Sequence, residues 1–288
     1  MSSLPPRPVA PLARRIDAHA HPAWLYRHPL LLRGVFGWYR LLYQRTWVVQ
    51  RALERELRRL PTGATVFDAG CGEGLFLFRT ARRFPHHHFV GGDVRASNLR
   101  LTRAYLKRTA LANVTLRHSD LLAADTLPAA RLLYCVGVLH LLPDDRAALR
   151  NLHRAAGPGA RLLLYTPVYR RRVLPWFAAW YRRFANYEAT HARRIYTDAS
   201  LRTLLTATGW EVEEMRYTNG TLGIVGYELY TGFFLLLSAG TVWQRPLGLL
   251  GVLLTLPLVV LLNAVDYWLE PRRGNGVLLT ARRITDPR

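Results

Sequence analysis

The sequence predicts an α/β protein with a doubly wound, mostly parallel seven-stranded sheet, preceded by amphipathic helices. An apolar helical hairpin is expected between the last two strands. Two observations support this fold. Short apolar runs alternate with helical stretches from residue 64 onward, and residues 218–275, mostly apolar, separate two segments that would ordinarily pair across a short turn. At 288 residues the chain can bury one such domain with additions, which accounts for its length better than two complete domains.

The first 60 residues divide into two parts. Residues 1–20 are rich in proline and arginine and are expected to form a disordered tail. They lack the apolar stretch of a signal peptide, so the folded body is expected in the cytoplasm. In residues 21–60, apolar positions from Leu32 to Tyr43 repeat at helical spacing beside several arginines, which predicts an amphipathic helical segment. This segment could cover the sheet or lie at a membrane surface.

The alternating pattern defines an α/β domain in residues 61–217 together with 276–288. Apolar runs bounded by helical stretches or turn residues predict its strands. The expected strands are 64–68, 88–94, 114–118, 132–136, 161–166, 210–217 and 276–283. A strand–helix–strand rhythm through the first five of them predicts parallel pairing.

Residues 168–200 interrupt this rhythm. Six apolar positions follow a helical repeat flanked by arginines: Val173, Trp176, Phe177, Trp180, Tyr181 and Phe184. Such a stripe is usually a packing face. Its place directly after the fifth strand also makes the segment a candidate lid over a substrate.

A glycine-rich turn follows the first strand. Asp68 ends this strand, and Gly70, Gly72 and Gly74 come at every second position after it, with Cys71 between the first two. Glycines there allow a tight turn and a close approach of the backbone to a ligand. Their spacing differs from the G-x-G-x-x-G turn that binds a dinucleotide pyrophosphate, which argues against a nicotinamide cofactor.

Three further features stand at the ends of the next strands. Asp93 ends the second strand, where an acidic side chain can accept ribose hydroxyls. Asp120 and Leu121 follow the third strand, and Gly137 follows the fourth. Together with the glycine turn, these residues make residues 60–168 resemble the class I methyltransferases that use S-adenosylmethionine.

The resemblance implies a role for each matching residue. Asp68, Gly70, Gly72 and Gly74 correspond to the motif that wraps the methionine portion of S-adenosylmethionine. Cys71 is then a loop or core residue within that motif, and not a nucleophile. Asp93, with Val94 beside it, corresponds to the ribose-binding acid, Asp120 and Leu121 to the adenine contacts, and Gly137 completes the cofactor set. The family usually has an aspartate where the fourth strand opens, whereas this chain has Ala130 and Arg131.

Candidate catalytic residues are those expected at the carboxyl ends of the strands, where reacting groups collect in a doubly wound sheet. His140 follows the fourth strand and Tyr169 the fifth, and His191 stands in the segment after it. A histidine can remove a proton from an acceptor, although His140 could equally be a neutral, hydrogen-bonded core residue. Neither the two cysteines nor the run His86 to His88 predicts a metal site.

Two long apolar stretches occupy the insertion. Residues 222–243 contain Glu228 as their only charge, and residues 247–269 contain only Asp266. Either is long enough to cross a bilayer as a helix. Because the flanking strands join one sheet, the chain must cross an even number of times or dip in and return, with Arg272 and Arg273 on the cytoplasmic side. The alternatives are a soluble apolar cap or a dimer interface.

These features together predict an enzyme that methylates a membrane-resident or hydrophobic small molecule. A lipid head group, an isoprenoid quinone or another lipid-linked acceptor fits, and the expected location is the cytoplasmic face of the membrane, with a soluble cytoplasmic protein as the alternative. The net charge of +21 also suits RNA, but the basic residues are dispersed instead of gathered in a binding module. A non-catalytic membrane scaffold with this fold is the third alternative.

Overall fold

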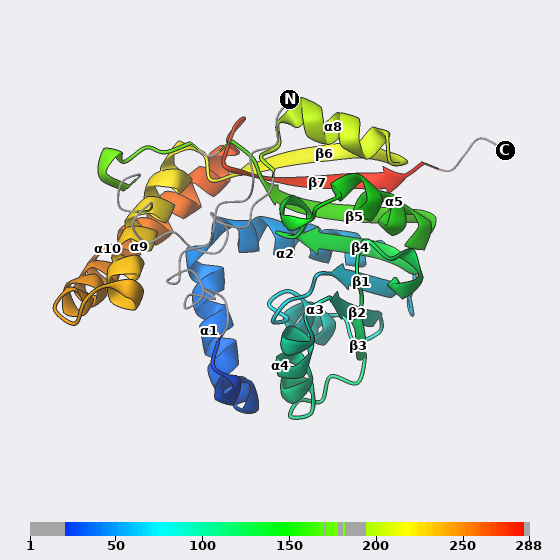
Figure 1. Cartoon of the computed structure of the whole chain (residues 1–288), viewed down its shortest axis with the longest axis horizontal. Coiled ribbons are helices and arrows are strands. Elements are labelled where there is room, and N and C mark those ends of the chain that lie inside the picture. Colours follow the sequence, from blue (N-terminus) through cyan, green and yellow to red (C-terminus); the bar gives the residue numbers. More distant parts are fainter. Residues whose placement is uncertain (1–20, 170, 178–180, 182–193, 285–288) are drawn as a thin grey trace.

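A computed structural model describes residues 21–169, 171–177, 181 and 194–284. Seven strands form one sheet in the order β3-β2-β1-β4-β5-β7-β6, in which β7 alone runs antiparallel to its neighbours (Figure 1). The strands are β1 Thr65–Ala69, β2 His88–Asp93, β3 Val114–His118, β4 Ala130–Val136, β5 Ala156–Pro167, β6 Trp210–Thr218 and β7 Gly276–Arg283. The predicted fold class is therefore confirmed.

Helices cover both faces of the sheet. Leu132 and Tyr134 of β4 point into one core, with α2 (Gln44–Leu57), α3 (Leu77–Arg83) and α4 (Ala96–Leu106). Leu133 and Cys135 point into the other, with α5 (Asp145–Ala155) and α8 (Asp198–Thr206). This alternation is the two-residue period of a strand with both faces buried. Short 3-10 helices η2 (Ala124–Thr126) and η3 (Leu139–Leu141) follow β3 and β4.

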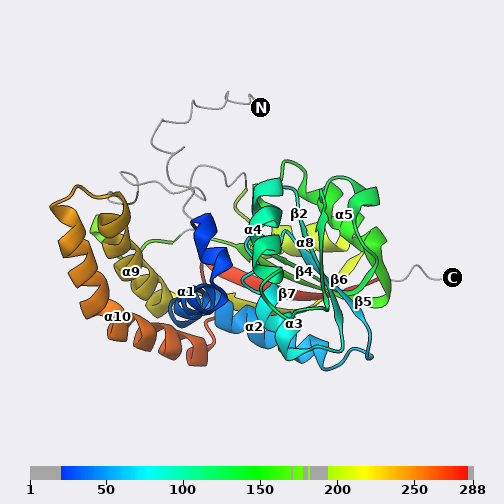
Figure 2. The same cartoon turned by 90° about the horizontal axis from the view of Figure 1, so that it is seen from below.

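The N-terminal segment forms more than one helix. The 3-10 helix η1 (Ala23–Arg27) precedes α1 (Pro29–Leu42), and the backbone becomes extended at Tyr43 before α2 begins. On α1, Leu32, Phe36 and Leu42 are buried, so the predicted amphipathic pattern does mark its packing face. Figure 2 shows α1 between the hairpin and the α/β domain.

Helices α9 (Thr221–Ala239) and α10 (Gln244–Leu269) form the hairpin after β6. Both are long and apolar enough to cross a membrane. Three of their polar side chains nevertheless face protein. Glu228 accepts hydrogen bonds from the backbone N–H groups of Val173 and Leu174, and Asp266 accepts from Gln44 Nε2 at 2.9 Å. Asn263 donates to the Leu42 carbonyl at 2.7 Å.

Candidate active site

The glycine turn after β1 adopts a backbone that other residues rarely accept. Gly70, Gly72 and Gly74 have φ values of 87°, 51° and 86°. A Cβ atom at Gly70 would lie 2.4 Å from Val138 Cγ2, and one at Gly74 would lie 2.6 Å from the Phe78 ring. A Cβ at Gly72 would meet nothing within 4 Å. The left-handed backbone therefore favours glycine at position 72, whereas packing against neighbouring atoms does not. The space beside this glycine is open.

Asp93 ties this turn to the end of β2. Its carboxylate accepts hydrogen bonds from Gly72 N at 2.9 Å, Arg95 N at 2.7 Å and Asn98 Nδ2 at 3.2 Å. A carboxylate offers about four acceptor positions, so roughly one remains for a ligand hydroxyl. Accepting both ribose hydroxyls would require one of the three donors to be exchanged, and the longest bond is that from Asn98.

Asp68 lies at the end of β1 and is buried. Burial raises the pKa of its carboxyl to about 8, the Tyr134 hydroxyl opposes this rise, and the neighbouring Asp93 carboxylate adds to it. At neutral pH the Asp68 carboxyl therefore keeps its proton for most of the time. A carboxyl poised in this way responds readily to a charged group placed beside it.

The other expected cofactor residues surround the same edge of the sheet. Gly137 has φ 73° and, like Gly72, open space where a Cβ would lie. Asp120 turns the chain after β3 by accepting from Leu122 N at 2.9 Å, Leu121 is buried, and Val94 is 56% exposed. The Cys71 thiol is buried, and burial raises its pKa well above the usual range, as suits a packing residue rather than a nucleophile.

The departure from the family pattern lies at the opposite edge. Ala130 is buried at the start of β4, and Arg131 is exposed with its guanidinium donating to the Pro158 carbonyl at 3.2 Å. This is the amino end of the strand, whereas the glycine turn and Gly137 are at the carboxyl ends. The missing aspartate therefore leaves the cofactor edge unchanged.

An unexpected contact joins the N-terminal segment to the glycine turn. The Glu73 carboxylate accepts from His21 N at 3.2 Å and pairs with His21 Nδ1, while His21 Nε2 contacts the Tyr39 hydroxyl at 2.8 Å. Burial and Glu73 also raise the pKa of Tyr39 to about 12. His21 therefore lies beside the glycine turn at the cofactor edge. Nothing in the sequence pattern marks this pairing, because 52 positions separate its two partners.

The three catalytic candidates have different surroundings. His140 lies in η3 directly after β4 and is only 1% exposed. Tyr169 follows β5 in a left-handed conformation, with φ 44°, and its hydroxyl donates to Asp198 at 3.2 Å. The Tyr217 hydroxyl binds the other oxygen of Asp198, a residue that the sequence did not indicate. His191 lies outside the described residues.

The site suits S-adenosylmethionine. Gly72 and Gly137 leave open space beside left-handed backbone, and buried carboxyls end β1 and β2. Within the described residues, no group of three or more histidine, cysteine, aspartate or glutamate side chains could hold a metal ion.

Comparisons with known proteins agree with this geometry. Residues 41–215 match the family model described as a methyltransferase domain. An uncharacterised methyltransferase of Mycobacterium tuberculosis is 37% identical over 105 residues, covering 35% of this chain and 49% of the relative. The chain spans less than half the length of the curated relatives it matches.

Solved structures show the same fold at low identity. A putative sarcosine dimethylglycine methyltransferase from Galdieria sulphuraria has a TM-score of 0.58 and 12% identity, over 83% of this chain and 86% of that one. A mycolic acid cyclopropane synthase complexed with SAH and CTAB has a TM-score of 0.56 and 14% identity, over 81% and 83%. The chain belongs to the methyltransferase domain family and has the class I fold of S-adenosylmethionine-dependent methyltransferases.

Proposed function

We propose that this chain transfers a methyl group from S-adenosylmethionine to a hydrophobic or lipid-linked substrate at the cytoplasmic face of a membrane. The observation that carries the proposal is the place where the hairpin joins the sheet. Strand β6 runs parallel to β5, because both pair antiparallel with β7. Helix α9 follows the carboxyl end of β6, and α10 leads back to the start of β7. The hairpin therefore leaves from the same edge that carries the cofactor turns.

The outer surface of α10 supports contact with lipid. Seven exposed apolar residues repeat at spacings of three and four along the helix: Leu247, Leu250, Leu254, Leu258, Leu261, Val265 and Trp268. Such a continuous stripe is costly in water and typical of a membrane-facing helix. Two residues of α10 that would be costly in hydrocarbon, Asn263 and Asp266, are buried against α1 and α2.

The packing of α1 favours a hairpin embedded in one leaflet over a full crossing. Leu42, at the end of α1, packs with Val252 and Val259, which lie near the middle of the 26-residue helix α10. Trp38 of α1 also donates to the Tyr230 hydroxyl at the middle of α9, so a crossing perpendicular to the bilayer would carry this part of α1 to the level of the hydrocarbon core. A hairpin whose outer face lies in the cytoplasmic leaflet avoids that cost.

Catalysis then depends mainly on placement. When bound, S-adenosylmethionine supplies a methyl group activated by a sulfonium. The chain holds the acceptor at the carboxyl edge and excludes water from it. His140 and Tyr169 are the side chains after β4 and β5 that we propose to contact the acceptor, with His191 approaching from the segment before α8. Thr166, buried at the end of β5 with no hydrogen-bond partner for its hydroxyl among the described residues, is a further candidate contact.

A labelling experiment tests the proposal. The purified chain is incubated with a lipid extract and methyl-labelled S-adenosylmethionine, and mass spectrometry searches for a species heavier by one methyl group. The Gly72→Ala variant is the control, because it should lose the cofactor while keeping the hairpin. Labelled RNA together with unlabelled lipid would favour a nucleic-acid substrate. A protein that stays soluble without detergent and does not pellet with anionic liposomes would contradict the membrane assignment.

A further inference from the structure

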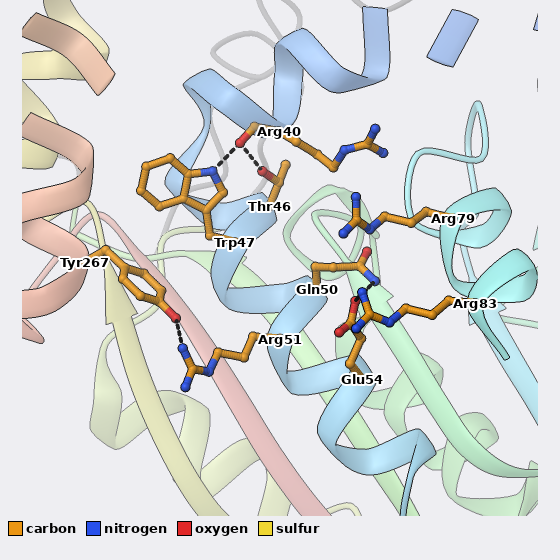
Figure 3. A pocket seen from close by; sticks show the side chains of 9 residues that line it. All are labelled: Arg40, Thr46, Trp47, Gln50, Arg51, Glu54, Arg79, Arg83 and Tyr267. Atoms are coloured by element: carbon orange, nitrogen blue, oxygen red, sulfur yellow. Dashed lines mark hydrogen bonds and ion pairs between the residues drawn. The ribbon is translucent and has the colours of Figure 1, made fainter. Parts of the chain in front are cut away.

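An open cavity of about 330 Å³ lies where α2 and α3 meet the end of α10 (Figure 3). It is separate from the cofactor edge, since none of the expected cofactor residues lines it. The lining residues are Arg40, Thr46, Trp47, Gln50, Arg51, Glu54, Arg79, Arg83 and Tyr267.

The lining carries a clear excess of positive charge, with four arginines and a single carboxylate. That carboxylate, Glu54, is already used by Arg83 at 3.4 Å and by the Gln50 amide at 3.1 Å. In the described part of the chain, no carboxylate pairs with Arg40, Arg51 or Arg79. Three of the four guanidinium groups in the cavity therefore have no carboxylate partner within the described residues.

Arg40 and Arg79 are the centre of this excess. Figure 3 shows their guanidinium groups extending toward one another from α1 and α3. The Nε atom of Arg79 is buried and has no hydrogen-bond partner among the described residues. Burial lowers the pKa of Arg40, and the charges of Arg79 and Arg82 lower it further. Two like charges held together in this way are relieved by an anion between them.

The hydrogen-bond donors that remain in the cavity indicate which kind of anion it fits. Thr46 Oγ1 and Trp47 Nε1 already donate to backbone carbonyls, so the guanidinium groups supply most of the remaining donors. Guanidinium forks match the oxygens of a phosphate and bind them in pairs. A phosphate can also accept from several arginines at once.

The cavity lies where the apolar outer surface of the hairpin ends. Tyr267 lines it, and the next residues, Trp268 and Leu269, are 75% and 67% exposed. Leu41, beside Arg40, is also exposed. A phospholipid has the same order of parts, with a phosphate directly above its acyl chains.

We propose that this cavity binds a phosphate group, and that the phosphate is that of an anionic phospholipid in the leaflet holding α10. The site concerns membrane binding rather than methyl transfer, and it rests on the proposed membrane location of the hairpin. It would orient the domain by fixing the end of the hairpin at head-group level.

Two variants of equal charge test this site. Arg40→Gln/Arg79→Gln removes two guanidinium groups from the cavity and relieves their repulsion, so the thermal midpoint should stay unchanged or rise. Arg146→Gln/Arg150→Gln makes the same charge change on exposed positions of α5, on the opposite face of the sheet. Co-sedimentation of the full chain is measured with vesicles of phosphatidylcholine, alone or mixed with phosphatidylglycerol.

Wild-type protein should bind the mixed vesicles more tightly than the neutral ones. Each cavity arginine is expected to contribute about fivefold, so the cavity variant should lose about 25-fold on mixed vesicles, and the α5 variant no more than about twofold. All three proteins should bind neutral vesicles equally through the hairpin. Equal losses in the two variants would overturn the proposal, because overall charge alone would then explain the binding.

A soluble probe distinguishes the source of the phosphate. Glycerol 3-phosphate is titrated into the full chain in an uncharged detergent and followed by calorimetry. Weak saturable binding that the cavity variant loses supports the site. The same result without any preference for phosphatidylglycerol vesicles would overturn the lipid as its source. No measurement here uses S-adenosylmethionine, so failure of the methyl-transfer proposal would leave these outcomes unaffected.

Discussion

Replacing Gly72 by alanine should abolish cofactor binding at a small cost in stability. Gly72 has φ 51°, and a Cβ atom there would meet no protein atom within 4 Å. The added methyl group therefore strains the backbone and fills space that the turn keeps open, without disturbing the core. Gly63 offers a matched control, because it has φ 80° with equally open surroundings and lies in an exposed turn before β1, at the opposite edge of the sheet.

The expected magnitudes follow from these two positions. A left-handed alanine costs about 1–2 kcal/mol, so Gly63→Ala and Gly72→Ala should lower the free energy of unfolding by similar amounts. In a chain of this size that is a fall of about 2–8 °C in the thermal midpoint. Cofactor at a hundredfold excess over its dissociation constant should raise the free energy of unfolding of the wild type and of Gly63→Ala by about 2.7 kcal/mol. Gly72→Ala should gain almost nothing.

Thermal unfolding with and without S-adenosylmethionine, together with calorimetric titration, measures both effects. Gly70→Ala provides a contrast, because its Cβ would lie 2.4 Å from Val138 Cγ2 and should add a packing penalty of about 1–3 kcal/mol to the backbone strain. The reasoning fails if Gly72→Ala binds the cofactor as tightly as the wild type. It fails as well if Gly63→Ala loses binding to the same degree.

Three further substitutions test other parts of the structure. The pKa of Asp68 is raised from 3.8 to about 8, so the stability that comes with its protonated form is complete below pH 3.8 and is lost progressively as the pH rises to about 8. The wild type should therefore lose up to about 1.4 kcal/mol per pH unit between pH 5 and 7 in denaturant titrations, a slope that Asp68→Asn should remove. Asn263→Ala leaves the buried Leu42 carbonyl without its donor and should cost about 1–3 kcal/mol in the same assay, and a change below 0.5 kcal/mol would contradict this contact. Glu228→Gln weakens the hydrogen bond to Leu174 N, so hydrogen exchange at that amide should become about tenfold faster while the β4 amides remain unchanged.

The parts of the fold that sequence predicted are those set by local pattern. The glycine turn needs left-handed backbone at three alternate positions, and only glycine adopts it freely, so Gly70, Gly72 and Gly74 are visible in the sequence. The inner strands β1 and β4 were visible because both faces of the sheet are buried there, which produces apolar runs. The edge strands β3 and β6 are partly exposed and have a weaker apolar pattern. The hairpin was visible from its length and its scarcity of charges.

Contacts between distant segments could not be predicted in this way. The pairing of His21 with Glu73 and that of Gln44 with Asp266 join positions 52 and 222 residues apart. The periodicity of apolar residues in the sequence does not indicate which partner a polar side chain will contact across such a separation. The sequence predicted amphipathic helices in this region without locating the boundary between them, which lies at Tyr43.

The buried polar groups of the hairpin show which of its faces contacts protein. Glu228 and Asp266 would each cost several kcal/mol in hydrocarbon if they faced lipid, and hydropathy alone gives no direction for them. In the structure Glu228 binds the start of the segment after β5, and Asp266 binds Gln44 of α2 and Gly220 N. The same contacts that remove the cost also attach the hairpin to the cofactor edge. An apolar outer face and a polar inner face therefore belong to one arrangement. In the function that we propose, a substrate leaving the membrane along α10 would arrive where β4 and β5 end.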